Sequence, residues 1–562
     1  MKNHIDLLGH DVPVDVAASV LIGLSAHIVL NRFELWPKQL FTVYWASVAI
    51  YTRHLVAEQG QSLASAIVRT LGLSYIVIAT LLVSVTAHRL LFHRLRRFPG
   101  PLSCKLTKWT TVSTDLNGLR SRFVDQQHKK YGDIVRTGPR ELSINDPSVI
   151  SAIGGGNSPC QKGPWYVGIH GGKGGRSHSL HSTVNKEDHA ARRRIWDAGF
   201  SQKALKSYES EIHTKTQQLI EELSSRARKG QVLNIDDWCL FFGYDLMGAV
   251  GFGTSFDMLS KGVIDKNVEI LETSMAHIMV VSNLPYLSEL VRYLPNPMKD
   301  FEVWLNMVLK KRIESGTKED YPDVFAFLLD EDKQSGWKHT WEELVSDAML
   351  MALAGAETSS TVLGLCLFTL SQHPDVLQKL RDELDDVFGK GVPCDDFDDL
   401  NKKCPYLNAV INETMRMYPP IASGLQKETP ASGLQVQVQG KQIVIPPHTV
   451  VHTPTMTMHR DPRYFSPEPN AYRPERWLDH HKNEERFEIK AFNPFSFGPT
   501  GCIGKTLAYM EIRLALANLV QTFDVKPTKE FNAKEFEDGL LDIFTTKRSK
   551  KMPVTLELRQ QK

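Results

Sequence analysis

The N-terminal part of the chain is dominated by apolar segments. Residues Thr70 to Ala87 contain no charged side chain and are long enough to cross the hydrocarbon core of a bilayer as a helix. Two shorter apolar segments, Val16 to Leu30 and Leu40 to Tyr51, precede it, and the second favours a hairpin or an interfacial segment. We therefore expect residues 1–97 to be a membrane anchor in contact with lipid, with one to three hydrophobic segments, of which 70–87 is the strongest.

The end of the anchor is marked by charge and by proline. Four arginines follow the apolar segment directly: Arg89, Arg94, Arg96 and Arg97. By the positive-inside rule this end faces the cytosol. Phe98-Pro99-Gly100-Pro101 then stops the helix and fixes the direction in which the chain leaves it, because two prolines flank a glycine. We expect residues 98–101 to be a hinge.

The remainder of the chain, residues 102–562, has mainly helical patterns. Short β-like runs such as Gln442 to Pro446 are few, and there is no internal repeat or low-complexity linker. These features predict one large domain that is mainly α with small β-sheets. The net charge of +2 gives no indication of nucleic-acid binding, and the seven scattered cysteines argue against a disulfide framework and against structural zinc.

The longest helical pattern runs from Thr340 to His373. Thr340 and Glu343 form a capping box at its start, and its middle is apolar almost all round, which predicts a buried helix. Gly355, Glu357 and Thr358 disturb this apolar middle. A mid-helix glycine costs about 1 kcal/mol relative to alanine, and buried polar groups cost more unless they are paired. The segment therefore indicates either function or a chance kink.

A second apolar stripe begins directly after Cys502. Its members are Ile503, Leu507, Met510, Leu514 and Ala517. The stripe places Cys502 at a helix N-terminus, where free amides and the helix dipole favour a thiolate. Gly498, Gly501 and Gly504 allow a sharp turn and the close approach of a flat group. Such a cysteine is suited to be the single axial ligand of a haem iron; the alternative is a buried cysteine in a glycine-rich turn.

These residues also carry a family resemblance. Phe495, Gly498, Cys502 and Gly504 match the F-x-x-G-x-x-x-C-x-G haem-binding loop of the cytochrome P-450 monooxygenases. The resemblance implies the cytochrome P-450 fold and a haem b whose iron has Cys502 as its axial thiolate. The segment from Ala354 to Thr358 is similar to the family's [AG]-G-x-[DE]-T helix, in which the glycine opens a groove for dioxygen. The resemblance implies that Thr358 and Glu357 deliver protons there.

A buried charge cluster belongs to the same resemblance. Glu413 and Arg416 form an E-x-x-R pair on one helical face, and Arg476 resembles the third member of the family's Glu-Arg-Arg cluster. Two guanidiniums can satisfy one buried carboxylate through bidentate bonds. We interpret these three residues as structural.

Haem propionates require cations, and this chain departs from the family there. His189 and Arg193 resemble the family's H-x-x-x-R pair, which binds propionates, whereas Arg192 and Arg194 are expected on a solvated basic face that could meet an acidic electron donor. Many members carry arginine or histidine where this chain has Thr500. The nearest cation after the preceding helix is Lys427. We expect His189, Arg193 and Lys427 to hold the haem propionates.

Several segments are expected around a substrate pocket. The glycine-rich segment from Gly154 to Gly175 is predicted to be a mobile loop that arches over the pocket, and the three histidines in or near it have no metal-ligand spacing: His170, His178 and His181. By position in the family, two further segments are candidates for the pocket wall: Ile421-Ala422-Ser423 and Leu541 to Phe544.

The combined motifs look most similar to fungal microsomal members of secondary metabolism. They imply a membrane-bound monooxygenase of the endoplasmic reticulum, with its catalytic domain in the cytosol, that hydroxylates or epoxidises an apolar small molecule such as a terpenoid, alkaloid or polyketide. Because the chain has no dinucleotide fingerprint, electrons must come from NADPH-cytochrome P-450 reductase, with cytochrome b5 as a further candidate donor. Two alternatives stay open: a reductase-independent haem-thiolate isomerase or dehydratase, and a non-catalytic haem-binding membrane protein.

Overall fold

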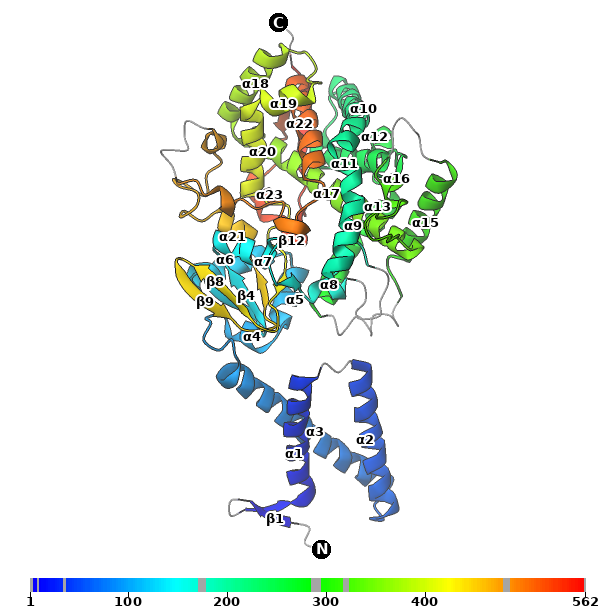
Figure 1. The fold of residues 1–562 in the computed structure, drawn as a ribbon, viewed down its shortest axis with the longest axis vertical. Coiled ribbons are helices and arrows are strands. Elements are labelled where there is room, and N and C mark those ends of the chain that lie inside the picture. The colour runs from blue at the N-terminus through cyan, green and yellow to red at the C-terminus, as the bar shows by residue number, and fades with distance from the viewer. Residues whose placement is uncertain are drawn as a thin grey trace.

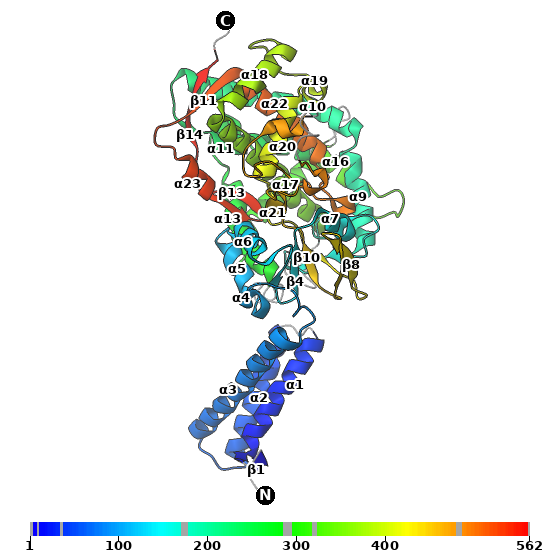
Figure 2. The same cartoon turned by 90° about the vertical axis from the view of Figure 1, so that its left-hand side faces the viewer.

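Three helices at the N-terminus form a bundle apart from the rest of the chain (Figures 1 and 2). The computed structural model describes residues 4–7, 10–33, 37–169, 178–284, 295–316, 323–478 and 486–559. After the hairpin β1 (His4–Leu7) and β2 (His10–Pro13) come α1 (Val14–Arg32), α2 (Pro37–Ala57) and α3 (Leu63–Ala87). Both α1 and α2 pack on α3. An ion pair between Arg69 and Asp15, at 2.5 Å, joins α3 to α1.

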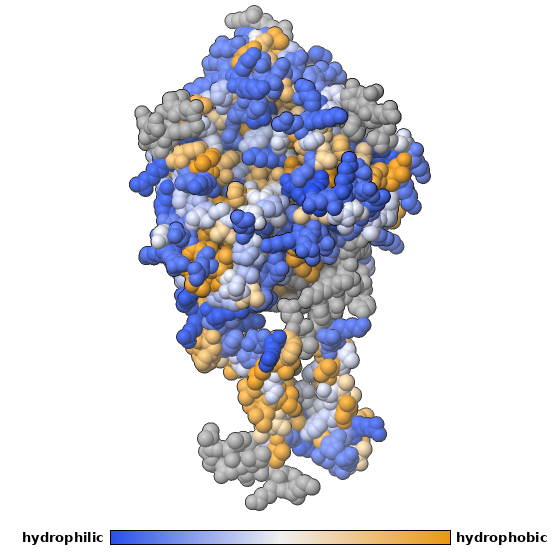
Figure 3. All heavy atoms as spheres, in the orientation of Figure 1, coloured by the Kyte–Doolittle hydropathy of each residue, from blue (hydrophilic) through white to orange (hydrophobic). Residues whose placement is uncertain are grey.

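Two of these helices have the length and composition of membrane spans. The 18-residue windows in Val14–Arg32 and Leu63–Phe92 have mean hydropathies of 1.7 and 2.0, and 11% of each is buried. The second extends through a π-helical turn, His88–Phe92, so the predicted segment 70–87 is the middle of a longer helix. Figure 3 shows apolar side chains on the outside of this bundle. Leu40 to Tyr51 lie within the 21-residue helix α2, so the prediction of a hairpin is wrong, whereas the alternative of an interfacial segment stays a prediction.

The rest of the chain is mainly helical, as predicted. Its longer helices are α6 (Arg120–Tyr131), α9 (Lys186–Gly199), α10 (Gln202–Arg228), α11 (Ile235–Phe252), α13 (Lys266–Asn283), α15 (Lys299–Glu314), α17 (Trp341–Gln372), α18 (Pro374–Phe388), α20 (Pro405–Met417) and α22 (Lys505–Thr522). The shorter ones are α4 (Leu102–Leu106), α5 (Trp109–Leu116), α7 (Pro147–Gly154), α8 (Trp165–Gly168), α12 (Met258–Lys261), α16 (Val324–Leu328), α19 (Phe397–Lys402), α21 (Thr455–His459) and α23 (Ala533–Asp538).

Helix α17 runs through the centre of this helical body. The predicted capping box is present, since the Thr340 hydroxyl accepts from the Glu343 amide and the Glu343 carboxylate accepts from the Thr340 amide. The helix packs on α11, α20 and α22, which explains its apolar middle. A Cβ at Gly355 would lie 2.3 Å from Met247 Cε on α11, so this glycine allows close packing of two helices. The helix is continuous through this segment.

Small sheets flank the helices. The largest has the strand order β3-β4-β10-β7-β5, with bounds Ile134–Gly138, Glu141–Ile144, Val450–His452, Lys427–Glu428 and Gln161–Lys162. A second joins β11 (Phe523–Pro527), β14 (Pro553–Leu558) and β6 (Leu233–Asn234). Two hairpins complete the set: β8 (Leu434–Val438) with β9 (Lys441–Ile445), and β12 (Leu540–Ile543) with β13 (Thr545–Arg548). The predicted β-like run at 442–446 forms most of β9.

The expected buried charge cluster is present beside α20. The Glu413 carboxylate accepts from Arg416 Nε at 2.8 Å, from Arg476 Nε at 3.0 Å and from Trp477 Nε1 at 3.0 Å. The Glu413 and Arg416 side chains are fully buried. Burial alone would raise the pKa of Glu413, but the hydrogen bonds and charges of the two arginines hold it below its ordinary value. Because Arg476 and Trp477 both bond to Glu413, the cluster fixes the segment from Tyr472 to Trp477 against α20.

Candidate active site

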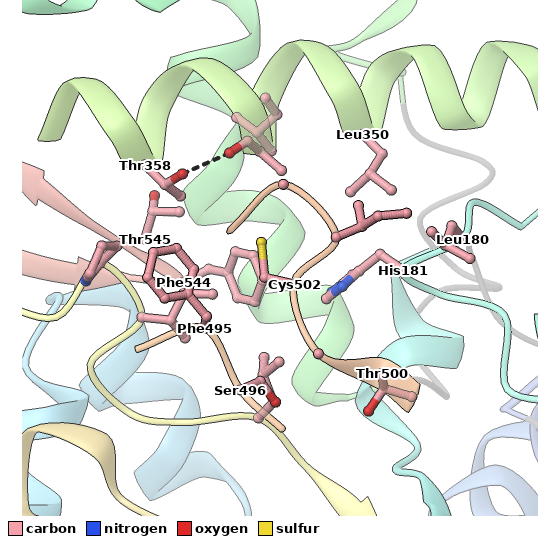
Figure 4. Close-up of a pocket in the computed structure, with 18 of the residues that line it drawn as sticks. Leu180, His181, Leu350, Thr358, Phe495, Ser496, Thr500, Cys502, Phe544 and Thr545 are labelled. Carbon is pink, nitrogen blue, oxygen red and sulfur yellow. Dashed lines mark hydrogen bonds between the residues drawn. The ribbon is translucent and has the colours of Figure 1, made fainter. Parts of the chain in front are cut away.

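A cavity of about 370 Å³ lies beneath α17. Its walls come from α9, α13, α17, the loop before α22, the segment after α20 and the β12–β13 turn, and most of its lining surface is apolar. Figure 4 shows Thr358 and Leu350 pointing into it from α17 and Cys502 facing them from the loop below. A cavity of this size, with few polar groups, suits a small apolar molecule.

The loop that carries Cys502 is held in a fixed shape. The Cys502 amide donates to the Phe495 carbonyl at 2.8 Å, and α22 starts at Lys505 just beyond. Gly498 has a φ of +73°, and a Cβ there would lie 2.0 Å from the carbonyl oxygen of Gly154, so only glycine fits. The apolar stripe therefore predicted the position of Cys502 correctly.

The Cys502 thiol faces the cavity and is the exposed cysteine of the chain; the other six are buried. Burial from bulk water raises the pKa of this thiol, while the backbone amides of Gly504 and Lys505 and the charge of Arg193 oppose the rise. Among the described residues, no group of three or more His, Cys, Asp or Glu could hold a metal ion. This donor set fits a haem, because Cys502 would supply the thiolate and the porphyrin would supply the nitrogen ligands of the iron.

Cationic and basic side chains from three elements line the same cavity. His189 and Arg193 come from α9, Lys427 from β7, and Lys162 from β5. The antiparallel register places Lys162 directly opposite Lys427. Lys427 Nζ donates to the Thr500 hydroxyl at 2.7 Å, so the lysine reaches the position at which the family often has a cation. Arg193 Nη1 donates to the Gly501 carbonyl at 2.7 Å and steadies the cysteine loop.

In this cavity cluster, which consists of Lys162, His189, Arg193 and Lys427, Arg193 is paired with Asp197 at 2.8 Å, whereas the two lysines lie beside other cations. Burial lowers the pKa of Lys162 to about 7, helped by Lys427, Arg192 and Arg193. Burial also lowers the pKa of Lys427 to about 8 and that of His189 to about 3. Among the described residues, neither lysine is ion-paired with a carboxylate, and each is at most 9% exposed. The two propionates of a haem would supply the missing charges, so these residues fit the group.

Lys162 is the member of the cavity cluster that the sequence did not reveal. Its Nζ donates to the carbonyls of Leu180 at 3.0 Å and His181 at 2.6 Å. No sequence signal could have identified it, because its position depends on the register of two strands of two residues each.

Helix α17 presents Thr358 and Glu357 to different surroundings. Thr358 lines the cavity, and its hydroxyl donates to the Ala354 carbonyl at 2.8 Å (Figure 4). Glu357 is 3% exposed and does not line the cavity; its Oε1 lies 3.5 Å from Lys547 Nζ. Lys547 is also paired with Glu272 of α13 at 2.7 Å. The structure therefore brings Thr358, but not Glu357, to the cavity wall.

Glu357 is nevertheless able to exchange protons near neutrality. Burial, reinforced by the charge of Glu272, raises its pKa to about 7, while Lys547 opposes the rise. The Thr545 side chain lies against the Glu357 carboxyl and also lines the cavity. Thr545 therefore connects this carboxyl with the wall of the cavity.

The predicted pocket-wall segments contribute in part. Ile421 lines the main cavity, as does Phe544, whereas Ala422 is buried outside it. Phe544 stacks on Trp165 of α8, with ring centroids 5.0 Å apart. The predicted loop from Gly154 to Gly175 contains β5 and α8, and its residues 170–175, including His170, lie outside the described residues. His181 lines the cavity, and His178 does not.

The expectation that Arg192 lies on a solvated basic face of α9 is wrong. Its side chain is 2% exposed and pairs with Glu343 of α17 beside the ring of Trp337. Arg194 is partly exposed and pairs with Asp332 at 2.7 Å. The pattern of consecutive arginines could not show that α9 packs on the start of α17, and this packing turns one arginine inward.

A mainly helical body with one thiol facing an apolar cavity, and with two buried lysines in that cavity that have no carboxylate partner among the described residues, is the arrangement expected of a haem-thiolate protein. Comparison with known proteins agrees. The family described as Cytochrome P450 matches residues 99–553. The chain therefore belongs to the cytochrome P450 family of monooxygenases, whose members bind haem through a cysteine thiolate.

Relatives from fungi align over most of the chain. The cytochrome P450 monooxygenase FCK2 of Fusarium pseudograminearum is 34% identical over 95% of this chain and 96% of its own length. The tryprostatin B 6-hydroxylase of Aspergillus fumigatus is 32% identical over 93% of this chain and 92% of its own. The cytochrome P450 monooxygenase phqL of Penicillium fellutanum is 31% identical over 91% and 89%.

Proposed function

We propose that the protein is a membrane-bound monooxygenase of fungal secondary metabolism that hydroxylates or epoxidises an apolar small molecule. The observation that carries this proposal is the Cys502 thiol facing an apolar cavity, with Thr358 on the opposite wall. A haem b bound there would supply the activation of dioxygen, with electrons from NADPH-cytochrome P-450 reductase and cytochrome b5 as a further candidate donor. The printed name of the Aspergillus fumigatus relative, a hydroxylase, favours hydroxylation over epoxidation.

The residues of this chain would act in three ways. Cys502 would bind the haem iron through its thiolate, and Phe495, Gly498 and Gly504 would shape the loop that carries it. His189, Arg193, Lys427 and Lys162 hold the propionates. Thr358 holds a proton at the cavity wall, on its hydroxyl, and Glu357 replaces that proton from the far side of α17.

The membrane arrangement is part of the proposal. Residues 1–97 form the anchor, 98–101 the hinge and 102–562 the catalytic domain, which faces the cytosol from the endoplasmic reticulum. The two candidate spans and the arginines that follow α3 support this topology. Protease added outside sealed microsomes should digest the catalytic domain, and complete protection would reverse the topology. Deleting residues 1–97 should shift the protein towards the soluble fraction.

The central experiment tests Cys502. Reduced wild-type protein with carbon monoxide should absorb at the long Soret wavelength typical of thiolate ligation, and Cys502→Ala should lose that band. Cys366→Ala, which changes a buried cysteine of α17, is the matched control and should keep it. Retention of the band in Cys502→Ala would remove the basis of the proposal.

A second experiment separates monooxygenation from the alternatives. Product formation should require NADPH and the reductase, which an isomerase, a dehydratase or a non-catalytic haem protein would not. Thr358→Ala should keep haem but lose product per NADPH, because a general acid–base group contributes about 10²–10⁴-fold. The lost electrons should appear as hydrogen peroxide. Unchanged coupling would show that Thr358 has no part in proton delivery.

A further inference from the structure

A second, smaller cavity of about 50 Å³ adjoins the substrate cavity. The two cavities share six lining residues: Trp165, Met279, Ile421, Gly424, Leu425 and Phe544. Phe544 has a φ of +66°, a backbone conformation that bulky residues rarely adopt. This conformation places its ring, stacked on Trp165, at the boundary between the two spaces. The two cavities are therefore adjacent, and the Trp165 and Phe544 rings line both of them.

The far wall of the smaller cavity is polar, in contrast to the apolar main cavity. Its ionisable and amide side chains come from α5, α6, α13, β10 and β12, and all are at most 7% exposed: Asp115, Arg120, Asn283, His452 and Asp542. Most of their hydrogen bonds are made within the protein. The Asp542 carboxylate accepts from the Ser121 amide at 3.0 Å and from the Ser423 hydroxyl. The Asn283 amide donates to Asp115.

Two buried atoms in this wall have no hydrogen-bond partner: Arg120 Nη1 and His452 Nδ1. The other terminal nitrogen of Arg120 donates to Glu141 at 2.5 Å. Native proteins rarely leave such donors and acceptors unpaired when they are buried. These two atoms therefore require hydrogen-bond partners from a group that occupies the cavity.

Of the two unpaired atoms, one is a hydrogen-bond donor and the other is an acceptor. Glu141 remains a carboxylate, since Lys108, Arg120 and His452 hold its pKa well below the ordinary value despite its burial. A carboxylate only accepts, so His452 Nε2, 3.4 Å from Glu141 Oε1, must carry the proton. Burial lowers the pKa of His452, which is therefore neutral, and its Nδ1 is left as an acceptor. Arg120 Nη1 is a donor.

The charges of the cavity exclude ionic ligand groups. An anion would satisfy Arg120 but would lie beside the carboxyl groups of Asp115 and Asp542, whose pKa values burial already raises, that of Asp115 to about 7, and a further negative charge there would oppose their ionisation. A cation would satisfy those acids but would leave the Arg120 donor unpaired. A neutral group with an acceptor and a donor on one edge satisfies both orphan atoms.

We propose that this polar pocket is the specificity end of the substrate site, and that it takes the amide edge of a lactam or primary amide on an otherwise apolar substrate. The carbonyl accepts from Arg120 Nη1, and the N–H donates to His452 Nδ1. The apolar remainder extends past Trp165 and Phe544 into the main cavity beneath Thr358. The proposal rests on the monooxygenase function and names the substrate class for that site.

The experiment uses three probes with the same butyl-substituted six-membered ring: a lactam, a ketone and a hydrocarbon. Full-length haem-loaded protein is titrated with each probe, and binding is followed by the haem absorption change and by the shift in unfolding temperature. Ratios of affinity are compared between variants, so that differences in probe hydrophobicity cancel. Since hydrogen bonds to a charged or buried partner are strong, the wild-type preference for lactam over ketone should be roughly tenfold.

Two variants separate the two bonds. His452→Gln keeps an amide where Nε2 lies but has no atom at Nδ1, so it should abolish the preference for lactam over ketone. His452→Asn, which restores an atom at Nδ1, is its matched partner and should retain the preference. Arg120→Lys keeps the charge beside Glu141 and should lower the ketone-to-hydrocarbon ratio about tenfold. Met275→Leu, on the apolar wall, should leave both ratios unchanged.

Each outcome has a defined meaning. Equal ratios in wild type, Arg120→Lys and His452→Gln would overturn the proposal and show that the pocket holds water only. A variant that loses haem or no longer unfolds cooperatively is left out of the comparison. The two His452 variants test the bond to the N–H of the probe, and the Arg120 variant independently tests the bond to its carbonyl. Failure of the proposed function is distinguishable, because it would appear as the absence of the thiolate carbon monoxide band while the shift in unfolding temperature still reports probe binding.

Discussion

Two charge clusters in this protein differ in whether their cations have a carboxylate partner. The Glu413 cluster contains one carboxylate, two guanidiniums and an indole N–H, and all three donor groups bond to that carboxylate. The cavity cluster contains two lysines, a histidine and an arginine, and among the described residues its lysines have no carboxylate partner. Glu413, Arg416 and the two lysines of the cavity cluster are all buried, so burial does not distinguish structure from function. The distinction lies in whether the protein supplies the counter-charge.

The cavity cluster has features that a structural cluster would avoid. Like charges directly opposite on neighbouring strands are destabilising, and Lys162 and Lys427 occupy such positions on β5 and β7. In the Glu413 cluster, the removal of one partner leaves an uncompensated charge. In the cavity cluster, the removal of one partner relieves repulsion. The two clusters should therefore respond to substitution with opposite signs.

The largest effect is expected in the self-contained cluster. Glu413→Gln leaves Arg416 and Arg476 buried without a counter-charge and should lower the free energy of unfolding by about 3–5 kcal/mol. Chemical denaturation of the haem-free protein measures this loss. Glu475→Gln, which removes a partly exposed carboxylate paired with Lys379, is the control and should cost about 1 kcal/mol or less. Similar losses in both variants would show that the Glu413 cluster has no special structural role.

The cavity cluster should behave in the opposite way. Lys162→Met and Lys427→Met should weaken haem retention by about 2–5 kcal/mol, the usual cost of truncating one partner of a buried charge pair. The haem-free protein should be as stable as wild type or more stable. Haem per polypeptide after gel filtration and the unfolding of the haem-free protein are the two measurements. Lys186→Met, on the exposed start of α9, is the control. A loss of haem-free stability in either variant would place these lysines with the structural cluster.

A smaller effect should link Arg193 to Thr500. Arg193→Ala should lose haem more readily, and Thr500→Arg should partly restore it, because the new guanidinium would lie beside Lys427. We expect a coupling free energy of about 1–2 kcal/mol from haem retention in the two single variants and the double variant. Additive effects would mean that Arg193 acts only through its bond to the Gly501 carbonyl.

The smallest effect concerns pH. The pKa values of Lys162 and Lys427 in the folded protein, about 7 and about 8, lie below the ordinary value of 10.5. Between these values the unfolded chain binds more protons, so the haem-free protein should gain stability as pH rises from about 7 to about 10.5 and lose it on acidification. Because water enters the empty cavity, we expect on the order of 1 kcal/mol. Lys162→Met should flatten this slope, and an unchanged slope would contradict the assignment.

The sequence predicted those features that depend on local pattern. The capping box at Thr340, the position of Cys502 before α22 and the pairing of Glu413 with Arg416 all follow from spacing within one helix or loop. Features that depend on distant packing were missed. Lys162 needed the register of β5 with β7, and the inward turn of Arg192 needed the contact between α9 and α17.

Helix α17 also constrains how the chain is made. By composition it qualifies as a membrane span, with a mean hydropathy of 1.4, yet 72% of that window is buried within the protein. Of its main packing partners, α11 precedes it in the chain, but α20 and α22 are synthesised afterwards. While the ribosome is still translating those later helices, the apolar surface of α17 that will face them is not yet covered. A holding chaperone or slow release from the ribosome would therefore matter more for this helix than for any other in the catalytic body.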